Sequence, residues 1–238
     1  MPTKHPKEEM RKKKAVVIHS GGMDSSICLA LAMQELGKDA VTSLSFYYGQ
    51  RHASEIIQAE KICKDWNIAH ATLNLSCLSQ VTANALINPA VAIEKDPPTT
   101  PNTLVVGRNG LMARLGAIYA DYLGASFIYL GVIGVEGNYS GYRDCSREYF
   151  DLKQKILRID LANPHFKILT PLVSLTKKET LEIAHRLGIL EYLLNTTITC
   201  YEGISQAGCQ QCPACRLRNK GLQEFKEANP GVLLNVEP

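Results

Sequence analysis

The fold of this 238-residue chain is decided by the stretch Ala15-Val-Val-Ile-His-Ser-Gly-Gly-Met-Asp-Ser-Ser-Ile-Cys-Leu29. The β-branched residues up to Ile18 are enough for one short buried strand. The Ser-Gly-Gly turn that follows is one that glycine makes most easily, and the residues from Asp24 onward suit the first turn of a helix. A strand that turns through glycines into a helix directs backbone N–H groups and the positive end of the helix dipole at one point. The stretch therefore predicts a phosphate-binding loop.

Composition and charge describe a globular protein. Hydrophobic residues make up 45% of the chain and charged residues 21%, which is enough apolar mass for a full core. The net charge is +3, but residues 1–14 hold six lysines and arginines against two glutamates, so the remainder carries −1. We therefore expect a flexible tail over residues 1–14, and no stable nucleic-acid partner for the body of the protein.

The N-terminal segment does not resemble a secretion signal. The apolar run after its lysines covers only residues 15–18, which is too short for a signal sequence, and no stretch approaches the length of a membrane span. We expect a cytoplasmic protein without a membrane partner. In that compartment its eight cysteines are thiols or metal ligands rather than disulfides.

Hydrophobic patterns and turn residues predict alternating strands and helices. The expected strands are 15–18, 41–46, 70–75, 126–132 and 167–171, and the expected helices are 25–36, 53–66, 110–123, 146–159 and 176–188. This order predicts an α/β fold, a Rossmann-like parallel sheet flanked by helices, over residues 15–195. Residues 76–103 contain repeated proline turns and fit no helix, so we expect them to form a lid or insert beside the substrate site.

Four cysteines near the C-terminus predict a metal site in a zinc-binding region over residues 196–238. Cys200, Cys209, Cys212 and Cys215 follow the pattern Cys-x₈-Cys-x₂-Cys-x₂-Cys. Four thiolates with no open position are typical of one structural zinc ion per chain, while an iron–sulfur cluster and a redox dithiol are the alternatives. The remaining cysteines include two on apolar helix faces, which core packing explains.

The glycine loop and the cysteine cluster together resemble one family. The string Ser-Gly-Gly-x-Asp-Ser resembles the pyrophosphate-binding loop of the PP-loop ATP pyrophosphatases, and no lysine follows the glycines as it would in a Walker loop. With the cysteines, the chain resembles the QueC family, the 7-cyano-7-deazaguanine synthases, from Ala15 to Phe225. The segments that carry the resemblance are Ser20-Gly-Gly-Met-Asp-Ser-Ser26, Tyr48-Gly-Gln-Arg-His52, Val106-Gly-Arg-Asn109, Ser140-Gly-Tyr-Arg-Asp-Cys145, Thr170-Pro-Leu172 with Lys177 and Glu179, and Thr199-Cys-Tyr201.

The resemblance implies an ATP-dependent C–N ligase in queuosine biosynthesis. Its small-molecule substrates would be 7-carboxy-7-deazaguanine, ammonia and ATP. One ATP adenylates the carboxylate, ammonia displaces AMP to give an amide, and a second ATP converts the amide to the nitrile. The resemblance also implies Mg²⁺ on the phosphates and a homodimer.

Residue roles follow from these matches and from the chemistry. The ATP-binding residues are His19, Ser20, Gly21, Gly22, Met23, Asp24, Ser25, Ser26, Ile27, Cys28 and Leu29. The catalytic candidates are Asp24, Ser25, Arg108 and Lys177. Asp24 is also a candidate Mg²⁺ ligand, and the cations neutralise charge that develops on the phosphates. The substrate-binding candidates are Arg51, Tyr139, Tyr142 and Asp144.

Departures from the family pattern fall in the segments assigned to the substrate pocket. They are Asn138, Arg143, Ser146 and Val106, and they bear on substrate detail rather than on reaction type. The alternative function is a PP-loop tRNA-modifying enzyme of the thiolase type, which needs a tRNA-binding surface. A third possibility is a nucleotide sensor or zinc-ribbon interaction module without catalysis. A gel shift with tRNA and an assay of pyrophosphate release distinguish the three.

Overall fold

The structure is a computed structural model that describes residues 13–51, 54–88, 90–95, 100–134 and 142–234. Its centre is a sheet of five parallel strands in the order β3-β2-β1-β4-β5. The strands are β1 (Ala15–Ile18), β2 (Val41–Tyr47), β3 (Ala69–Asn74), β4 (Phe127–Leu130) and β5 (Lys167–Leu169). The parallel α/β sheet predicted from the sequence is confirmed, with each strand boundary within three residues of its expected place.

Seven α-helices lie in the described part of the chain. They are α1 (Met23–Leu36), α2 (Ser54–Trp66), α3 (Arg108–Tyr122), α4 (Arg147–Asp160), α5 (Lys177–Arg186), α6 (Leu190–Thr196) and α7 (Pro213–Ala228). Two helix starts follow the capping rules closely. The Thr176 and Glu179 side chains form a capping box at α5, and the Ser146 hydroxyl caps α4 by accepting the Tyr149 N–H. Ser146, a departure from the family pattern, therefore has a structural role in this chain.

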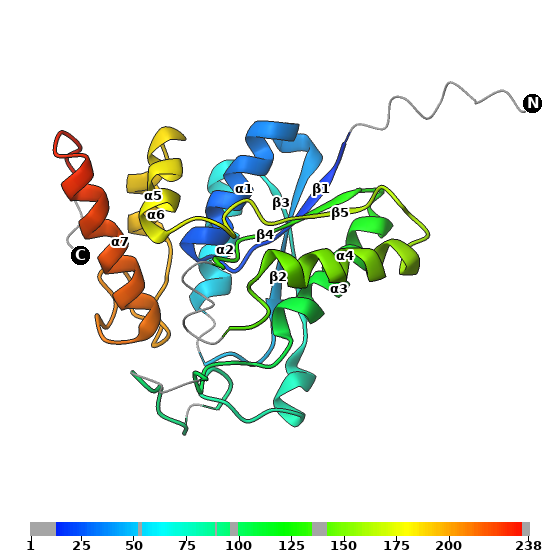
Figure 1. The fold of residues 1–238 in the computed structure, drawn as a ribbon, viewed down its shortest axis with the longest axis horizontal. Coiled ribbons are helices and arrows are strands. Elements are labelled where there is room, and N and C mark those ends of the chain that lie inside the picture. The colour runs from blue at the N-terminus through cyan, green and yellow to red at the C-terminus, as the bar shows by residue number, and fades with distance from the viewer. Residues whose placement is uncertain (1–12, 52–53, 89, 96–99, 135–141, 235–238) are drawn as a thin grey trace, which may run out of the picture.

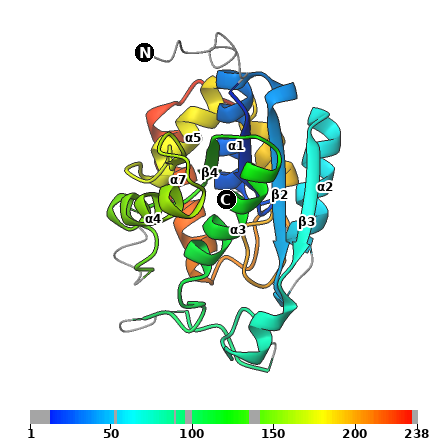
Figure 2. The ribbon, with the colours of Figure 1, turned by 90° about the vertical axis from the view of Figure 1, so that its right-hand side faces the viewer.

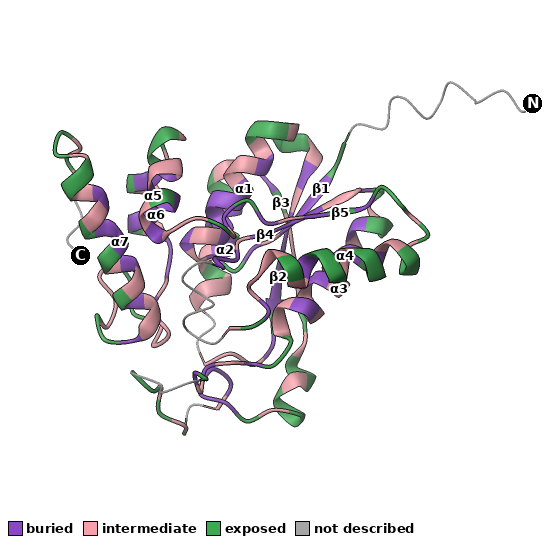
Figure 3. Ribbon diagram, in the orientation of Figure 1, coloured by how far each residue is buried: buried purple, intermediate pink, exposed green. Residues whose placement is uncertain are grey.

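Helices cover both faces of the sheet. Buried residues of α1, α2, α5, α6 and α7 form one apolar core with the sheet, and those of α3 and α4 form a second core on its other face. In Figure 2, α3 lies in front of the sheet and α1 behind it. Figure 3 shows that buried residues concentrate in the strands and on the inner sides of the helices. Both layers are therefore held by burial of apolar surface.

The C-terminal helices form an outer layer, and the sequence patterns predicted only the first of them. Helices α5, α6 and α7 stand together beside α1 (Figure 1), and α5 and α7 pack closely. A Cβ atom on Gly221 would lie 2.7 Å from the Cβ of Lys177, so glycine lets α7 approach the start of α5. Helix α7 thus contributes buried residues to the main core.

The strand order reverses at β1, and the glycine loop follows this strand at the reversal point. Strand β1 lies between β2 and β4, so the chain moves to one side of β1 first and to the other side later. In open parallel sheets, ligands bind beyond the carboxyl ends of the strands at such a switch point. The loop after Ile18 stands at this point. Among the described residues no helix has the length and apolarity needed to cross a membrane.

Candidate functional site

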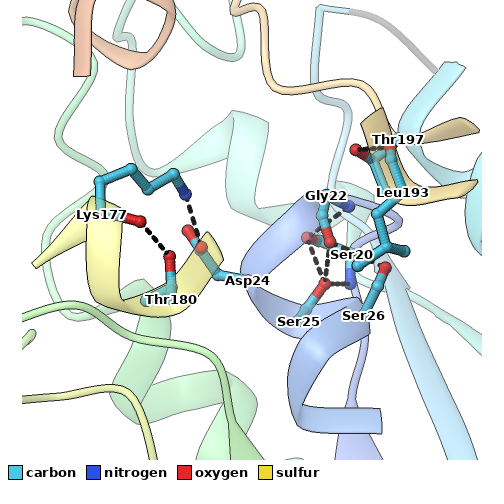
Figure 4. Close-up of polar contacts among 9 residues, drawn as sticks. All are labelled: Ser20, Gly22, Asp24, Ser25, Ser26, Lys177, Thr180, Leu193 and Thr197. Atoms are coloured by element: carbon cyan, nitrogen blue, oxygen red, sulfur yellow. Dashed lines mark hydrogen bonds and ion pairs between the residues drawn. The ribbon is translucent and has the colours of Figure 1, made fainter. Parts of the chain in front are cut away.

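The glycine loop is held by its own side chains. The Ser25 hydroxyl donates to the Gly22 carbonyl at 2.9 Å and accepts the Ser20 N–H at 3.1 Å, as Figure 4 shows. No side chain caps α1 at Gly22, so the N–H groups of the first helical turn are left for a ligand. Gly21 is needed because its φ is +82° and an added Cβ would lie 2.0 Å from the Glu55 carbonyl oxygen. The loop thus ends in a helix start without a side-chain cap, and phosphate binding there stays a prediction.

A lysine from α5 reaches this loop. Lys177 Nζ lies 2.5 Å from Asp24 Oδ1, and the side chains are 3% and 27% exposed. Figure 4 shows the two side chains pointing toward each other across the gap between α5 and α1. The loop has no lysine of its own, and 153 residues of chain separate this pair. The fold therefore places a buried cation beside the glycine loop, next to its acidic residue.

A cavity of about 650 Å³ opens from the loop along the carboxyl ends of the strands. The loop residues that line it are His19, Ser20, Gly22, Met23, Asp24 and Ser25. Arg51, Arg108, Tyr142 and Lys177 also line it. The candidates that the sequence assigned to ATP, charge neutralisation and substrate thus face one space. Its volume is typical of small-molecule sites.

Other predicted site residues lie away from the cavity. Ile27, Cys28 and Leu29 are fully buried in the core under the loop. The Ser26 hydroxyl turns back to the Gly22 carbonyl and to His19. Asp144 accepts the Asn109 N–H at 3.0 Å and so holds the start of α3. Tyr139, His52 and Asn138 are outside the described residues.

Arg108 lines the cavity together with several tyrosines. Its guanidinium donates to the Tyr48 hydroxyl at 3.0 Å and lies 5.5 Å from the centre of that ring. Burial opposes the charge, but Tyr48, Tyr201, Asp144 and Glu55 more than offset it and raise the pKa of Arg108. The group stays cationic in the cavity wall. A planar guanidinium in this position suits a carboxylate.

A chain of hydroxyl groups lies along the same wall. Tyr142 is 2.5 Å from the Thr103 hydroxyl and 3.2 Å from the Tyr201 hydroxyl. Thr199 also lines the cavity, and its buried hydroxyl has no hydrogen-bond partner within the described structure. These groups offer donors, acceptors and flat ring faces to a planar heterocycle.

Sequence reasoning missed several residues of this wall. Tyr48 and Tyr201 belong to segments quoted for the family resemblance, but they received no role. Glu55 was assigned only to a helix, because a carboxylate in a first helical turn is usually explained by the helix dipole. Only the three-dimensional structure shows that all three line the same cavity as Arg108 and raise its pKa. Arg51, in contrast, also has a structural role. Its side chain forms an ion pair with Glu202 at 3.6 Å and donates a hydrogen bond to the Val91 carbonyl.

Glu55→Gln is expected to remove a pH dependence of stability. Burial raises the pKa of Glu55 to about 7, although Arg108 opposes the shift. An acid with a raised folded-state pKa stabilises the fold while protonated, and this contribution is lost as pH rises from about 4.5 to about 7. When the pH rises from 5 to 8, the free energy of unfolding of the variant should therefore increase by about 1–3 kcal/mol relative to that of the wild type.

Urea unfolding of both proteins at the two pH values measures the Glu55 effect. Glu148→Gln is the matched control, because Glu148 is an exposed carboxylate in the first turn of α4. An equal stability difference between Glu55→Gln and wild type at both pH values would contradict the raised pKa.

The four C-terminal cysteines come together as the spacing predicted. One Sγ atom from each lies within 4.8 Å of the others. Backbone N–H groups point at the sulfurs: those of Glu202 and Cys209 approach Cys200 Sγ at 3.4 Å, and that of Cys212 approaches Cys209 Sγ at 3.2 Å. Such donors stabilise thiolates, so the cluster fits a tetrahedral metal ion such as zinc.

The surroundings of the cysteine cluster are built for close packing. Gly208 has a φ of +68°, and an added Cβ would lie 2.5 Å from Cys215 Sγ. The buried Arg218 side chain donates to the carbonyls of Gln206 and Ala207 and so braces the turn. Cys200 and its neighbour Tyr201 line the cavity, so the cluster supports one wall of the candidate active site.

Two solved structures are similar to this chain. An NMN synthetase structure from Francisella tularensis matches with a TM-score of 0.50 at 17% identity, covering 96% of this chain and 90% of that one. An NH₃-dependent NAD synthetase structure from Campylobacter jejuni, in complex with nitrate, has a TM-score of 0.48 at 16% identity, with coverages of 97% and 92%. At this identity the first likeness supports the fold alone.

The family comparison covers nearly the whole chain. The model described as "Queuosine biosynthesis protein QueC" matches residues 14–226. That range includes the glycine loop, the cavity wall around Arg108 and all four clustered cysteines. The chain therefore belongs to the QueC family, and it is an ATP-dependent enzyme whose function is 7-cyano-7-deazaguanine synthesis in queuosine biosynthesis.

Proposed function

We propose that this chain converts 7-carboxy-7-deazaguanine and ammonia to 7-cyano-7-deazaguanine through two adenylated intermediates. The observation that carries the proposal is the shared cavity, which has an uncapped helix start with Asp24 and Lys177 at the loop and Arg108 among tyrosines in its wall. The loop suits the pyrophosphate of ATP, and the wall suits a planar base with a carboxylate. A C–N ligase needs both in one site.

The chemistry requires two rounds of the same step. The substrate carboxylate attacks the α-phosphorus of ATP and releases pyrophosphate, and ammonia then displaces AMP to leave an amide. The amide oxygen attacks a second ATP in the same way, and loss of AMP and a proton gives the nitrile. In-line displacement at phosphorus depends on positioning and charge neutralisation. We assign the first-turn N–H groups, Ser25 and Lys177 to the pyrophosphate, because Ser25 and Lys177 line the cavity, and we assign Arg108 to the carboxylate.

Two metals accompany this proposal. The Asp24 carboxylate, half of an ion pair with Lys177, is the candidate ligand for Mg²⁺, which would supply charge neutralisation at the ATP phosphates. Cys200, Cys209, Cys212 and Cys215 would hold zinc. Because four thiolates leave no open coordination position, we assign zinc a structural role.

Product analysis tests the reaction directly. The protein is mixed with ATP, Mg²⁺, ¹⁵N-ammonium and 7-carboxy-7-deazaguanine, and the products are identified by mass spectrometry. We expect the labelled nitrile and release of two pyrophosphates for each nitrile formed. Pyrophosphate release that requires tRNA instead of the deazaguanine carboxylate would favour the thiolase-type alternative. An amide that accumulates without nitrile would restrict the activity to the first round.

Arg108→Lys is expected to raise the KM for 7-carboxy-7-deazaguanine by about tenfold or more, with little change in the KM for ATP. A lysine keeps the charge but loses the bidentate fork and the stacking on Tyr48. Arg114→Lys is the matched control. Arg114 is on the same helix, its side chain is 41% exposed, and it forms an ion pair with Asp160. An unchanged KM for the carboxylate substrate would exclude Arg108 from its binding.

We also propose that the protein is a homodimer. Apolar side chains form exposed rows on α3 and α4, at Ile118, Tyr122, Leu152, Ile156 and Ile159. Exposed apolar surface of this kind is typical of protein interfaces. Light scattering on the wild type should give the dimer mass and on Ile156→Asp the monomer mass. Ile57→Asp, at an exposed isoleucine of α2, is the control.

A further inference from the structure

A second group of metal-ligand side chains lies behind the glycine loop. His19 follows β1, Cys63 is on α2 and His70 is on β3. One ligand atom from each lies within 4.8 Å of the others. The sequence gives no spacing signal for this group, since 44 residues separate His19 from Cys63. The fold alone brings the three together, and they are distinct from the four-cysteine cluster.

The hydrogen bonds of His19 lead us to assign its proton to Nε2. The Ser26 hydroxyl donates to the Gly22 carbonyl at 2.9 Å, which leaves its oxygen to accept an N–H from His19 Nε2 at 3.0 Å. A neutral imidazole has one N–H, so with this assignment His19 Nδ1 presents a lone pair. That nitrogen lies 3.7 Å from Cys63 Sγ. The ring is almost fully buried, with 1% of its surface exposed.

His70 has the same arrangement from the other side. Its Nε2 lies 3.3 Å from the Thr72 hydroxyl, and its Nδ1 lies 3.6 Å from Cys63 Sγ. Both rings thus turn Nδ1 toward one sulfur and place Nε2 on a hydroxyl oxygen. Metal-bound histidines have this pattern, because the second nitrogen is held by an outer hydrogen-bond partner.

The distances match a tetrahedral ion. With Zn–S of about 2.3 Å and Zn–N of about 2.0–2.1 Å, tetrahedral angles separate the sulfur from each nitrogen by about 3.6 Å. The observed separations are 3.6 and 3.7 Å. The Ser43 hydroxyl lies 3.1 Å from His19 Nδ1 and 2.9 Å from His70 Nδ1, and so faces the fourth position.

We propose that His19, Cys63 and His70 bind a second zinc ion, with Ser43 at the fourth position. Two imidazole nitrogens and one sulfur suit zinc rather than Mg²⁺ or Ca²⁺, which prefer oxygen. On binding, the Cys63 thiol releases its proton to solvent and the sulfur bonds the metal. The half-buried His70 on the edge strand β3 gives the ion its entry route. The bound ion would fix α2 and β3 to the residue that precedes the phosphate loop.

Metal content of the full-length protein tests the site without relying on activity. Proteins purified with zinc supplementation and gel-filtered without chelator are analysed by inductively coupled plasma mass spectrometry. We expect two zinc ions per wild-type chain, one in Cys63→Ala, one in His70→Gln, and two in the control Cys77→Ala, an exposed cysteine outside both clusters. Cobalt substitution should add a charge-transfer band of a single Co²⁺–thiolate bond that Cys63→Ala lacks.

The outcomes decide the proposal. One zinc per wild-type chain, or two zinc ions in a folded Cys63→Ala protein, overturns it. If Cys63→Ala fails to fold, His70→Gln decides, because its side chain is only half-buried at the sheet edge. The result is independent of the proposed reaction, since zinc content is measured without substrate.

Discussion

Asp24→Asn is expected to lower pyrophosphate release from ATP by about 100-fold or more while the chain stays folded. The Asp24 carboxylate contacts Lys177 at 2.5 Å at the start of α1, beside the N–H groups that face the cavity. Asparagine keeps the side-chain volume but removes the negative charge that pairs with Lys177. It also removes the carboxylate that is the candidate Mg²⁺ ligand. Because the Asp24 side chain is 27% exposed, the loss of stability should be modest compared with the loss of turnover.

Pyrophosphate release with ammonium and the deazaguanine carboxylate measures this effect, and urea unfolding measures the fold. Asp39→Asn is the matched control, at an exposed aspartate outside the cavity. Lys177→Met should cause a comparable loss of turnover, since it removes the other half of the pair. Wild-type turnover in Asp24→Asn would remove Asp24 from the mechanism.

The sheet and its first helices could be predicted because local rules decide them. The β-branched run before Ile18, the glycines after it and the capping box at Thr176 each agree with the tertiary structure. Helices α6 and α7 were not predicted, because the burial of their apolar residues depends on tertiary packing against α1 and α5. A short amphipathic segment next to a cysteine cluster gives no clear period of its own.

Candidate site residues were predicted where they belong to a sequence motif. They were missed where only tertiary contacts bring them to the site. The loop, Lys177, Arg108 and the four cysteines belong to recognisable strings. Glu55 and the cluster around Cys63 have no local signal, since their partners are distant in sequence. Cys63 was explained by core packing, and the structure adds two imidazole nitrogens within 3.7 Å of its sulfur.

Cys212→Ser is expected to abolish binding of the zinc ion that we propose for the C-terminal cluster and to unfold its surroundings. Structural zinc binds with an apparent free energy of about 10 kcal/mol or more, and the turns of this cluster have little apolar core apart from the cysteines themselves. Cys212 also caps α7 by accepting the Cys215 N–H, so the helix start is lost with the metal. Stability and solubility should therefore fall before the chemistry changes.

Zinc content, urea unfolding and limited proteolysis near residues 200–215 measure the effect of Cys212→Ser. Cys77→Ser is the control, because Cys77 is exposed and outside the cluster. Iron in place of zinc, or visible absorption of an iron–sulfur centre, would overturn the metal identity. A folded, zinc-loaded but inactive variant would indicate that the cluster takes part directly in the reaction. Cys200 lines the cavity, so the cluster would act at that wall.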